Sequence, residues 1–135
     1  MNKKRSLHLL VIIALFSVVG AWLPGVPAQA QTIRLGLSVS TQSNPFYQSL
    51  AQGVADEGKA LGAEVTVLSA DDQLEKQISD VEDLIAADID VLLINAVQGE
   101  AVGVIEDAIS AGIPVITLQR AVASSLVTSH LGTDN

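Results

Sequence analysis

Short apolar runs alternate with helix-like segments along residues 31–135, and this alternation limits the possible folds more than any other feature of the sequence. Several of the runs are almost continuously apolar, as is typical of parallel strands buried on both faces. Because single helical segments separate them, right-handed crossovers must join successive strands. The sequence therefore predicts an α/β fold with a doubly wound parallel sheet. The expected strands are 33–39, 64–69, 91–94, 115–118 and, less distinctly, 126–131.

The ends of the intervening helices carry recognisable signals. Asn44 followed by Pro45 predicts the start of the first helix, since asparagine caps helices and proline suits their first turn. Gly62 and Gly112 lie where a left-handed residue would end a helix. Gly58 falls inside the first helix and is expected to weaken it by about 1 kcal/mol relative to alanine.

The second helix has the clearest periodicity. Asp71 and Asp72 precede it and are predicted to cap it, because acidic side chains favour a helix N-terminus. Four apolar residues at helical spacing define its buried face. They are Leu74, Ile78, Val81 and Ile85.

Residues 1–30 have the pattern of a secretory signal peptide. Three basic residues precede an apolar run over residues 9–19, and Ala28-Gln29-Ala30 forms a small-x-small site, which predicts cleavage after Ala30. The apolar run is shorter than the roughly 20 residues that a membrane span needs. The chain has no cysteine, which excludes disulfides, thiolate metal sites and a lipid-modified N-terminus. We expect a periplasmic domain without membrane insertion after signal cleavage.

The charge of residues 31–135 excludes several classes of partner. Four cationic and fifteen acidic side chains give this part a net charge of −11. Such a surface repels phosphate backbones and anionic lipids, so nucleic-acid binding is not expected. A length of about 105 residues is enough for one compact lobe.

Polar and aromatic side chains follow the expected strands at their carboxyl ends, where open α/β sheets bind ligands. Amides and hydroxyls beside flat apolar rings suit a sugar, which stacks through its C–H face and forms hydrogen bonds through its hydroxyls. The candidate ligand-binding residues are Ser40, Asn44, Phe46, Tyr47, Asn95, Gln119 and Arg120.

Five of the seven candidates also have an ordinary structural interpretation. Phe46 and Tyr47 could pack the first turn of their helix, and Asn44 could cap it instead of contacting a ligand. Asn95 could bond within its own turn. Arg120 could be a solvated charge or a partner of Asp134, but its forked donors at this edge favour ligand contact.

The sequence lacks the residue patterns expected of a catalytic site or a cofactor site. His130 is the sole histidine after residue 30, so it cannot share a metal site with a second one. The sequence contains neither a G-x-S-x-G elbow nor the glycine-rich nucleotide motifs. We therefore expect no enzymatic activity, no catalytic residue, no metal and no cofactor.

Four segments in order resemble the periplasmic sugar-binding proteins of ABC importers, most closely the ribose-binding type. The resemblance implies one lobe, with flavodoxin-like strand order and three αβα layers, of a two-lobed binding protein that closes on a monosaccharide and delivers it to a membrane permease. It also implies that Asp134 and Asn135 begin the first hinge crossing. The segments are residues 40–47, 91–95, 114–120 and 129–135.

Two features differ from that family. Gln119 stands where an aspartate usually precedes the arginine, and a neutral amide lacks the charge-assisted bond to a sugar hydroxyl. The sugar is therefore left open. The chain also stops at the expected first hinge crossing, which suggests a lobe truncated from a longer protein. The alternative is a stand-alone lobe that acts as an interaction or dimerising module.

Overall fold

The computed structural model describes residues 31–132. The predicted signal peptide, its cleavage site and the hinge residues Asp134 and Asn135 lie outside the described residues. The elements are β1 (Arg34–Val39), α2 (Pro45–Ala60), β2 (Glu64–Ser69), α3 (Leu74–Ala86), β3 (Val91–Ile94), the 3-10 helix η1 (Gly99–Ala101), α4 (Val102–Ser110), β4 (Val115–Leu118) and β5 (Ser129–Leu131).

The strands within residues 31–132 form one five-stranded sheet in the order β2-β1-β3-β4-β5. All four pairings are parallel, with Leu37 opposite Val67 on one side and Leu93 on the other. This is the predicted doubly wound sheet of flavodoxin-like order. The fifth strand is shorter than predicted, because only residues 129–131 pair with β4.

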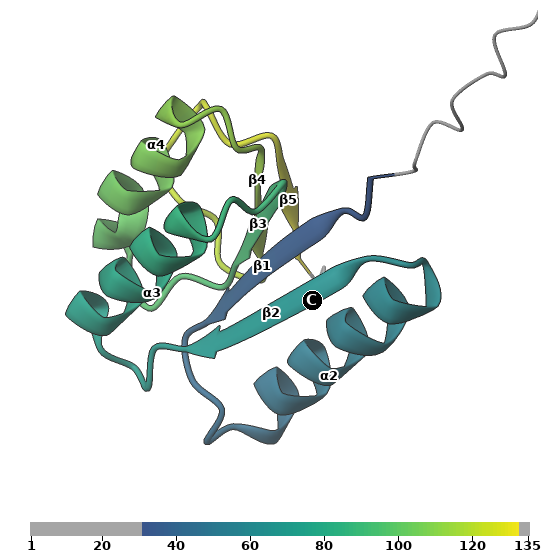
Figure 1. Cartoon of the computed structure of the whole chain (residues 1–135). Coiled ribbons are helices and arrows are strands. Elements are labelled where there is room, and N and C mark those ends of the chain that lie inside the picture. Colours follow the sequence, from purple (N-terminus) through teal and green to yellow (C-terminus); the bar gives the residue numbers. More distant parts are fainter. Residues whose placement is uncertain (1–30, 133–135) are drawn as a thin grey trace, which may run out of the picture. The chain divides into compact units, whose positions relative to one another are not determined.

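Helices cover both faces of the sheet and complete the three predicted layers (Figure 1). Helices α3 and α4 pack on one face over a buried cluster that includes Val81, Leu92 and Ile105. Helix α2 packs on the other face over a smaller cluster that contains Leu37 and Val39. The middle strand of the sheet is β3, with β1 and β4 as its neighbours.

The predicted helix ends are confirmed for α2 and α4 and wrong at one position for α3. The Asn44 side chain accepts a hydrogen bond from the Phe46 N–H at 2.9 Å, and Gly62 and Gly112 have φ angles of 79° and 84°. Asp71 and Asp72 do not cap α3, because the N-cap is Gln73 and its side chain makes no capping bond.

Asp71 and Asp72 instead form a left-handed turn, with φ angles of 52° and 60°. The Asp72 N–H donates to the Ser40 carbonyl at 2.7 Å, which joins the loop after β2 to the loop after β1. Both acids were expected at the helix start because of their charge, but the tight turn needs residues that tolerate positive φ.

Candidate functional site

The carboxyl ends of β1, β3 and β4 meet at one edge of the sheet because these strands are parallel neighbours. All seven candidate ligand-binding residues lie at this edge, five in the loops that leave the strands and two, Phe46 and Tyr47, in the first turn of α2. Two of the seven, Ser40 and Asn95, are fully buried, while Asn44, Phe46 and Arg120 are exposed. The edge therefore has a buried polar base and an exposed polar and aromatic rim.

Asn95 joins three strands through its side chain. Its Oδ1 accepts hydrogen bonds from the Ser40 hydroxyl at 2.6 Å and the Ser40 N–H at 3.3 Å. Its Nδ2 donates to the Leu118 carbonyl at 2.9 Å. These partners follow β1 and end β4, so the Asn95 amide fixes the spacing of the strand ends and does not bond within its own turn.

Gln77 is the residue at this edge that the sequence interpretation missed. It lies on α3, is fully buried, and donates from Nε2 to the Asn95 carbonyl at 3.0 Å and the Ser38 hydroxyl at 3.2 Å. Its Oε1 accepts from the Val97 N–H at 2.8 Å. A signal was present, because position 77 is one turn before Val81 and so shares the apolar face of the helix.

Arg120 is anchored through one of its three nitrogens. Its Nη1 donates to the Ala96 carbonyl at 2.9 Å and the Val97 carbonyl at 2.6 Å. Within residues 31–132 its Nε and Nη2 make no hydrogen bond, and the residue is exposed. The guanidinium is thus held in place while three of its five N–H donors stay available.

Gln119 lies in a sharp turn immediately after β4. Its φ angle is 62°, and the Arg120 N–H donates to the Leu118 carbonyl at 2.7 Å, which closes a three-residue turn around it. Such a conformation is strained for a residue with a side chain. The Gln119 N–H still pairs with the Leu131 carbonyl at 2.7 Å, so β5 supports the turn.

Asn44 caps its helix through Oδ1 alone, so the cap does not by itself prevent the side chain from having a further partner. The cap uses Oδ1, and within the described part of the chain Nδ2 makes no hydrogen bond and is exposed. Beside it, the rings of Phe46 and Tyr47 meet edge to face with centroids 5.3 Å apart. Phe46 is 49% exposed and belongs to neither apolar cluster, so packing in the core does not account for it.

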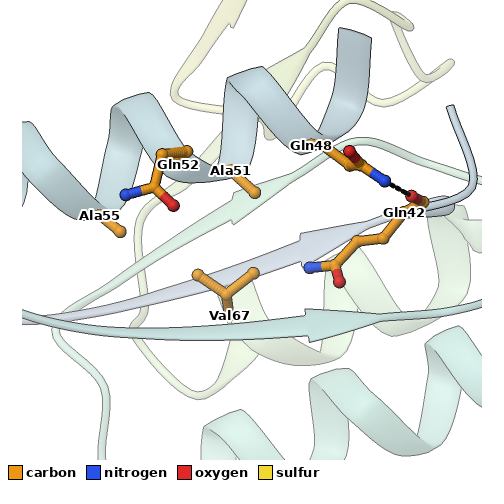
Figure 2. Close-up of a pocket in the computed structure, with 6 residues that line it drawn as sticks. All are labelled: Gln42, Gln48, Ala51, Gln52, Ala55 and Val67. Carbon is orange, nitrogen blue, oxygen red and sulfur yellow. Dashed lines mark hydrogen bonds between the residues drawn. The ribbon is translucent and has the colours of Figure 1, made fainter. Parts of the chain in front are cut away.

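The cavity in Figure 2 does not coincide with this edge site. It has a volume of about 310 Å³, lies between α2 and β2, and is lined by residues such as Gln42, Gln52 and Val67. None of the candidate ligand-binding residues lines it. The edge is the better candidate, because it combines a guanidinium and an exposed aromatic ring with its amides, whereas the cavity is lined by glutamine amides and small apolar side chains alone.

Residues 31–132 contain neither a candidate metal site nor a candidate membrane span. Nowhere in that part of the chain do three or more histidine or acidic side chains gather into a group that could hold a metal ion. None of its helices has the length and apolar character needed to cross a membrane.

Comparison with known proteins gives a consistent set of relatives. The family model described as the periplasmic binding protein domain matches residues 35–135. The ribose import binding protein of Escherichia coli is 37% identical over the whole chain, which corresponds to 44% of that protein.

Solved structures agree with the sequence matches. An ABC transporter solute-binding protein from Mycobacterium smegmatis, solved with bound glycerol, is 37% identical with a TM-score of 0.70, over 74% of this chain and 35% of that one. The myo-inositol binding protein of Caulobacter, bound to myo-inositol, is 27% identical with a TM-score of 0.71, over 82% of this chain and 38% of that one. The chain spans less than half the length of the curated relatives it matches: the match covers 29% of one ribose import binding protein and 44% of another.

Proposed function

Because this chain belongs to the periplasmic binding protein family, we propose that it binds a monosaccharide or a related polyol at the carboxyl edge of its sheet. Its relatives are solute-binding proteins and not enzymes. Three of its relatives carry ribose, glycerol or myo-inositol in their names or as bound molecules, and these molecules share closely spaced hydroxyls. We take this shared chemistry as the ligand class.

One observation carries the proposal: two side chains at the edge are each anchored through one atom and expose their remaining donors. Arg120 is held through Nη1, and Asn44 through Oδ1. A forked guanidinium can donate to two neighbouring hydroxyl oxygens, and the Asn44 amide can donate to a third. The exposed Phe46 ring offers an apolar face to the C–H side of a sugar.

The other candidates complete the proposed site. Tyr47 supports the Phe46 ring, and Gln119 supplies a neutral amide beside Arg120. Ser40 and Asn95 form the base on which these groups stand. We assign them to the ligand site as the residues that shape it, since both are buried.

We also propose the cellular role that the resemblance implies. The chain would be exported, cleaved after Ala30 and held in the periplasm as the solute-binding component of an ABC importer. The ligand would lie between this lobe and a second one, with Asp134 and Asn135 at the hinge, and would pass to a membrane permease. Mass spectrometry of the exported product should find an N-terminus at Gln31; an intact leader would contradict the cleavage site.

Titration of the purified chain with D-ribose, myo-inositol and tetrahydropyran, followed by two-dimensional NMR, tests the site. We expect the first two to shift the amide signals of residues 40–44, 46–47 and 95–98 and of Arg120, and tetrahydropyran, which has a sugar-like ring without hydroxyls, to shift none. The variant Arg120→Lys keeps the charge but loses the fork, so its shifts should be weaker. The matched control is Arg34→Lys, since Arg34 is exposed and begins β1 at the opposite edge.

Two results would contradict the proposal. Shifts confined to the cavity between α2 and β2 would place the ligand elsewhere. No response to any polyol, together with a dimer in sedimentation velocity, would favour the alternative of a dimerising lobe.

A further inference from the structure

We propose that Gln77 is a positioning residue that fixes the guanidinium of Arg120 through the main chain of residues 95–97. The ligand part of this inference rests on the proposed function, whereas the geometric part does not. Gln77 lies on α3 and, within the described residues, makes no hydrogen bond to Arg120, so we infer that any effect on the ligand passes through the loop between them.

The Gln77 amide holds both ends of that loop. Nε2 donates to the Asn95 carbonyl at 3.0 Å, and Oε1 accepts from the Val97 N–H at 2.8 Å. The segment 95–98 follows β3 and precedes η1, so it has no helix or strand of its own to orient its peptide groups. A buried amide that both donates and accepts takes over this task.

The peptide groups that Gln77 holds are the ones that Arg120 uses. Arg120 Nη1 donates to the carbonyls of Ala96 and Val97, at 2.9 and 2.6 Å. The Val97 N–H, fixed by Gln77, belongs to the same peptide group as the Ala96 carbonyl. Because a peptide group is planar, fixing its N–H also fixes the direction of its carbonyl. Gln77 therefore sets the direction of one of the two acceptors that hold the guanidinium.

The bonds from Gln77 to residues 95–97 allow a positioning role to be distinguished from a purely structural role in the core. Loss of the Gln77 amide leaves the Val97 N–H unpaired and frees the Ala96 carbonyl to turn away, so the Arg120 fork should rotate more freely. Loss of the Ser38 hydroxyl removes another partner of Gln77, 3.2 Å from Nε2, and leaves residues 95–97 held. Both changes disturb buried hydrogen bonds, but only the first reaches Arg120.

The experiment compares Gln77→Met, which keeps the side-chain length without polar atoms, with the control Ser38→Ala. The first readout needs no ligand: it is the rate at which Nη1 and Nη2 of Arg120 exchange, measured by nitrogen-exchange NMR. We expect Gln77→Met to raise this rate at least about fivefold, which is the change that loss of one hydrogen bond of ordinary strength implies. We expect Ser38→Ala to leave the rate unchanged.

The second readout is D-ribose affinity. We expect Gln77→Met to weaken binding about tenfold in the wild-type background and less than about twofold in the Arg120→Lys background, because coupled residues are not additive. If Gln77→Met does not fold, Gln77→Glu tests the same link from the other side: it keeps an oxygen for the Val97 N–H and loses the donor to the Asn95 carbonyl, so the Arg120 exchange rate should stay at the wild-type value, and a raised rate would contradict the inference.

An Arg120 exchange rate that is the same in Gln77→Met and the wild type would overturn the inference. An affinity loss that persists in full in the Arg120→Lys background would also overturn it. If wild-type protein does not bind D-ribose, the proposed function fails for that sugar, and the exchange rate alone decides the role of Gln77.

Discussion

Substitution of Gly58 by alanine should destabilise the lobe, although Gly58 lies inside a helix where alanine is normally preferred. Helix propensity alone predicts a gain of about 1 kcal/mol. The structure predicts the opposite sign. A Cβ atom at position 58 would lie 2.4 Å from Cγ2 of Val65 on β2 and 3.7 Å from Cδ1 of Leu35 on β1.

The size of the effect follows from these contacts. Overpacking in a well-packed region costs about 1–3 kcal/mol. The upper part of that range applies, because 2.4 Å is far inside normal contact and the branched Val65 has one preferred rotamer to give up. With the propensity gain of about 1 kcal/mol subtracted, we expect Gly58→Ala to lower the free energy of unfolding by about 1–2 kcal/mol.

Urea unfolding followed by circular dichroism measures this difference. The matched control is Gly53→Ala in the same helix, where an added Cβ meets nothing within 4 Å and should stabilise the lobe by about 0.5–1 kcal/mol. The double variant Gly58→Ala/Val65→Ala should recover part of the loss, since it removes the clashing methyl group. Gly58→Ala that is as stable as wild type would refute the reasoning, because α2 would then have room to move away from β2.

Three other changes test separate parts of the lobe. Asn44→Ala should cost about 1 kcal/mol of stability, whereas Asn44→Ser should retain the cap and lose only D-ribose affinity; thermal unfolding and NMR titration separate the two. Lys76→Met should cost about 1–3 kcal/mol in urea unfolding, because it leaves the mostly buried Asp80 carboxylate, 3.1 Å from Nζ, without its partner; no loss would show that water replaces the lysine. Gln119→Asp should tighten D-ribose binding several-fold in the same titration, because a carboxylate accepts stronger hydrogen bonds from sugar hydroxyls. Aspartate also tolerates the left-handed turn at this position. Weaker binding would show that the Gln119 amide donates to the sugar.

The fold could be predicted from the sequence because its signals are local. Buried parallel strands appear as apolar runs, and Gly62 and Gly112 mark helix ends by a conformation that glycine adopts readily. The fifth strand was predicted too long, since an edge strand with exposed residues carries little apolar pattern. Asp71 and Asp72 were misassigned because charge favours a helix start and a left-handed turn alike.

The candidate site could be located but not assembled from the sequence. The sequence predicts which edge carries the site, because open parallel α/β sheets bind ligands at the carboxyl ends of their strands. The bonds that organise it do not, since Ser40 and Asn95 are 55 positions apart and Gln77 and Val97 are 20 apart. No spacing rule connects such residues, so Asn95 could be proposed as a ligand contact while its role in joining three strands stayed hidden.

If the ligand binds at this edge as proposed, the same hydrogen bonds serve both the stability of the lobe and ligand binding. Asn95 and Gln77 are buried, and each forms hydrogen bonds through both the oxygen and the nitrogen of its amide, so these bonds form when the sheet and α3 assemble. The groups above them are therefore ordered before a ligand arrives, which removes part of the entropic cost of binding. The Arg120 side chain is ordered in the same way, because the carbonyls that hold its Nη1 belong to Ala96 and Val97, in the loop that Gln77 fixes. Substitutions in the buried base should accordingly lower stability and affinity together, whereas substitutions of the exposed rim should lower affinity alone.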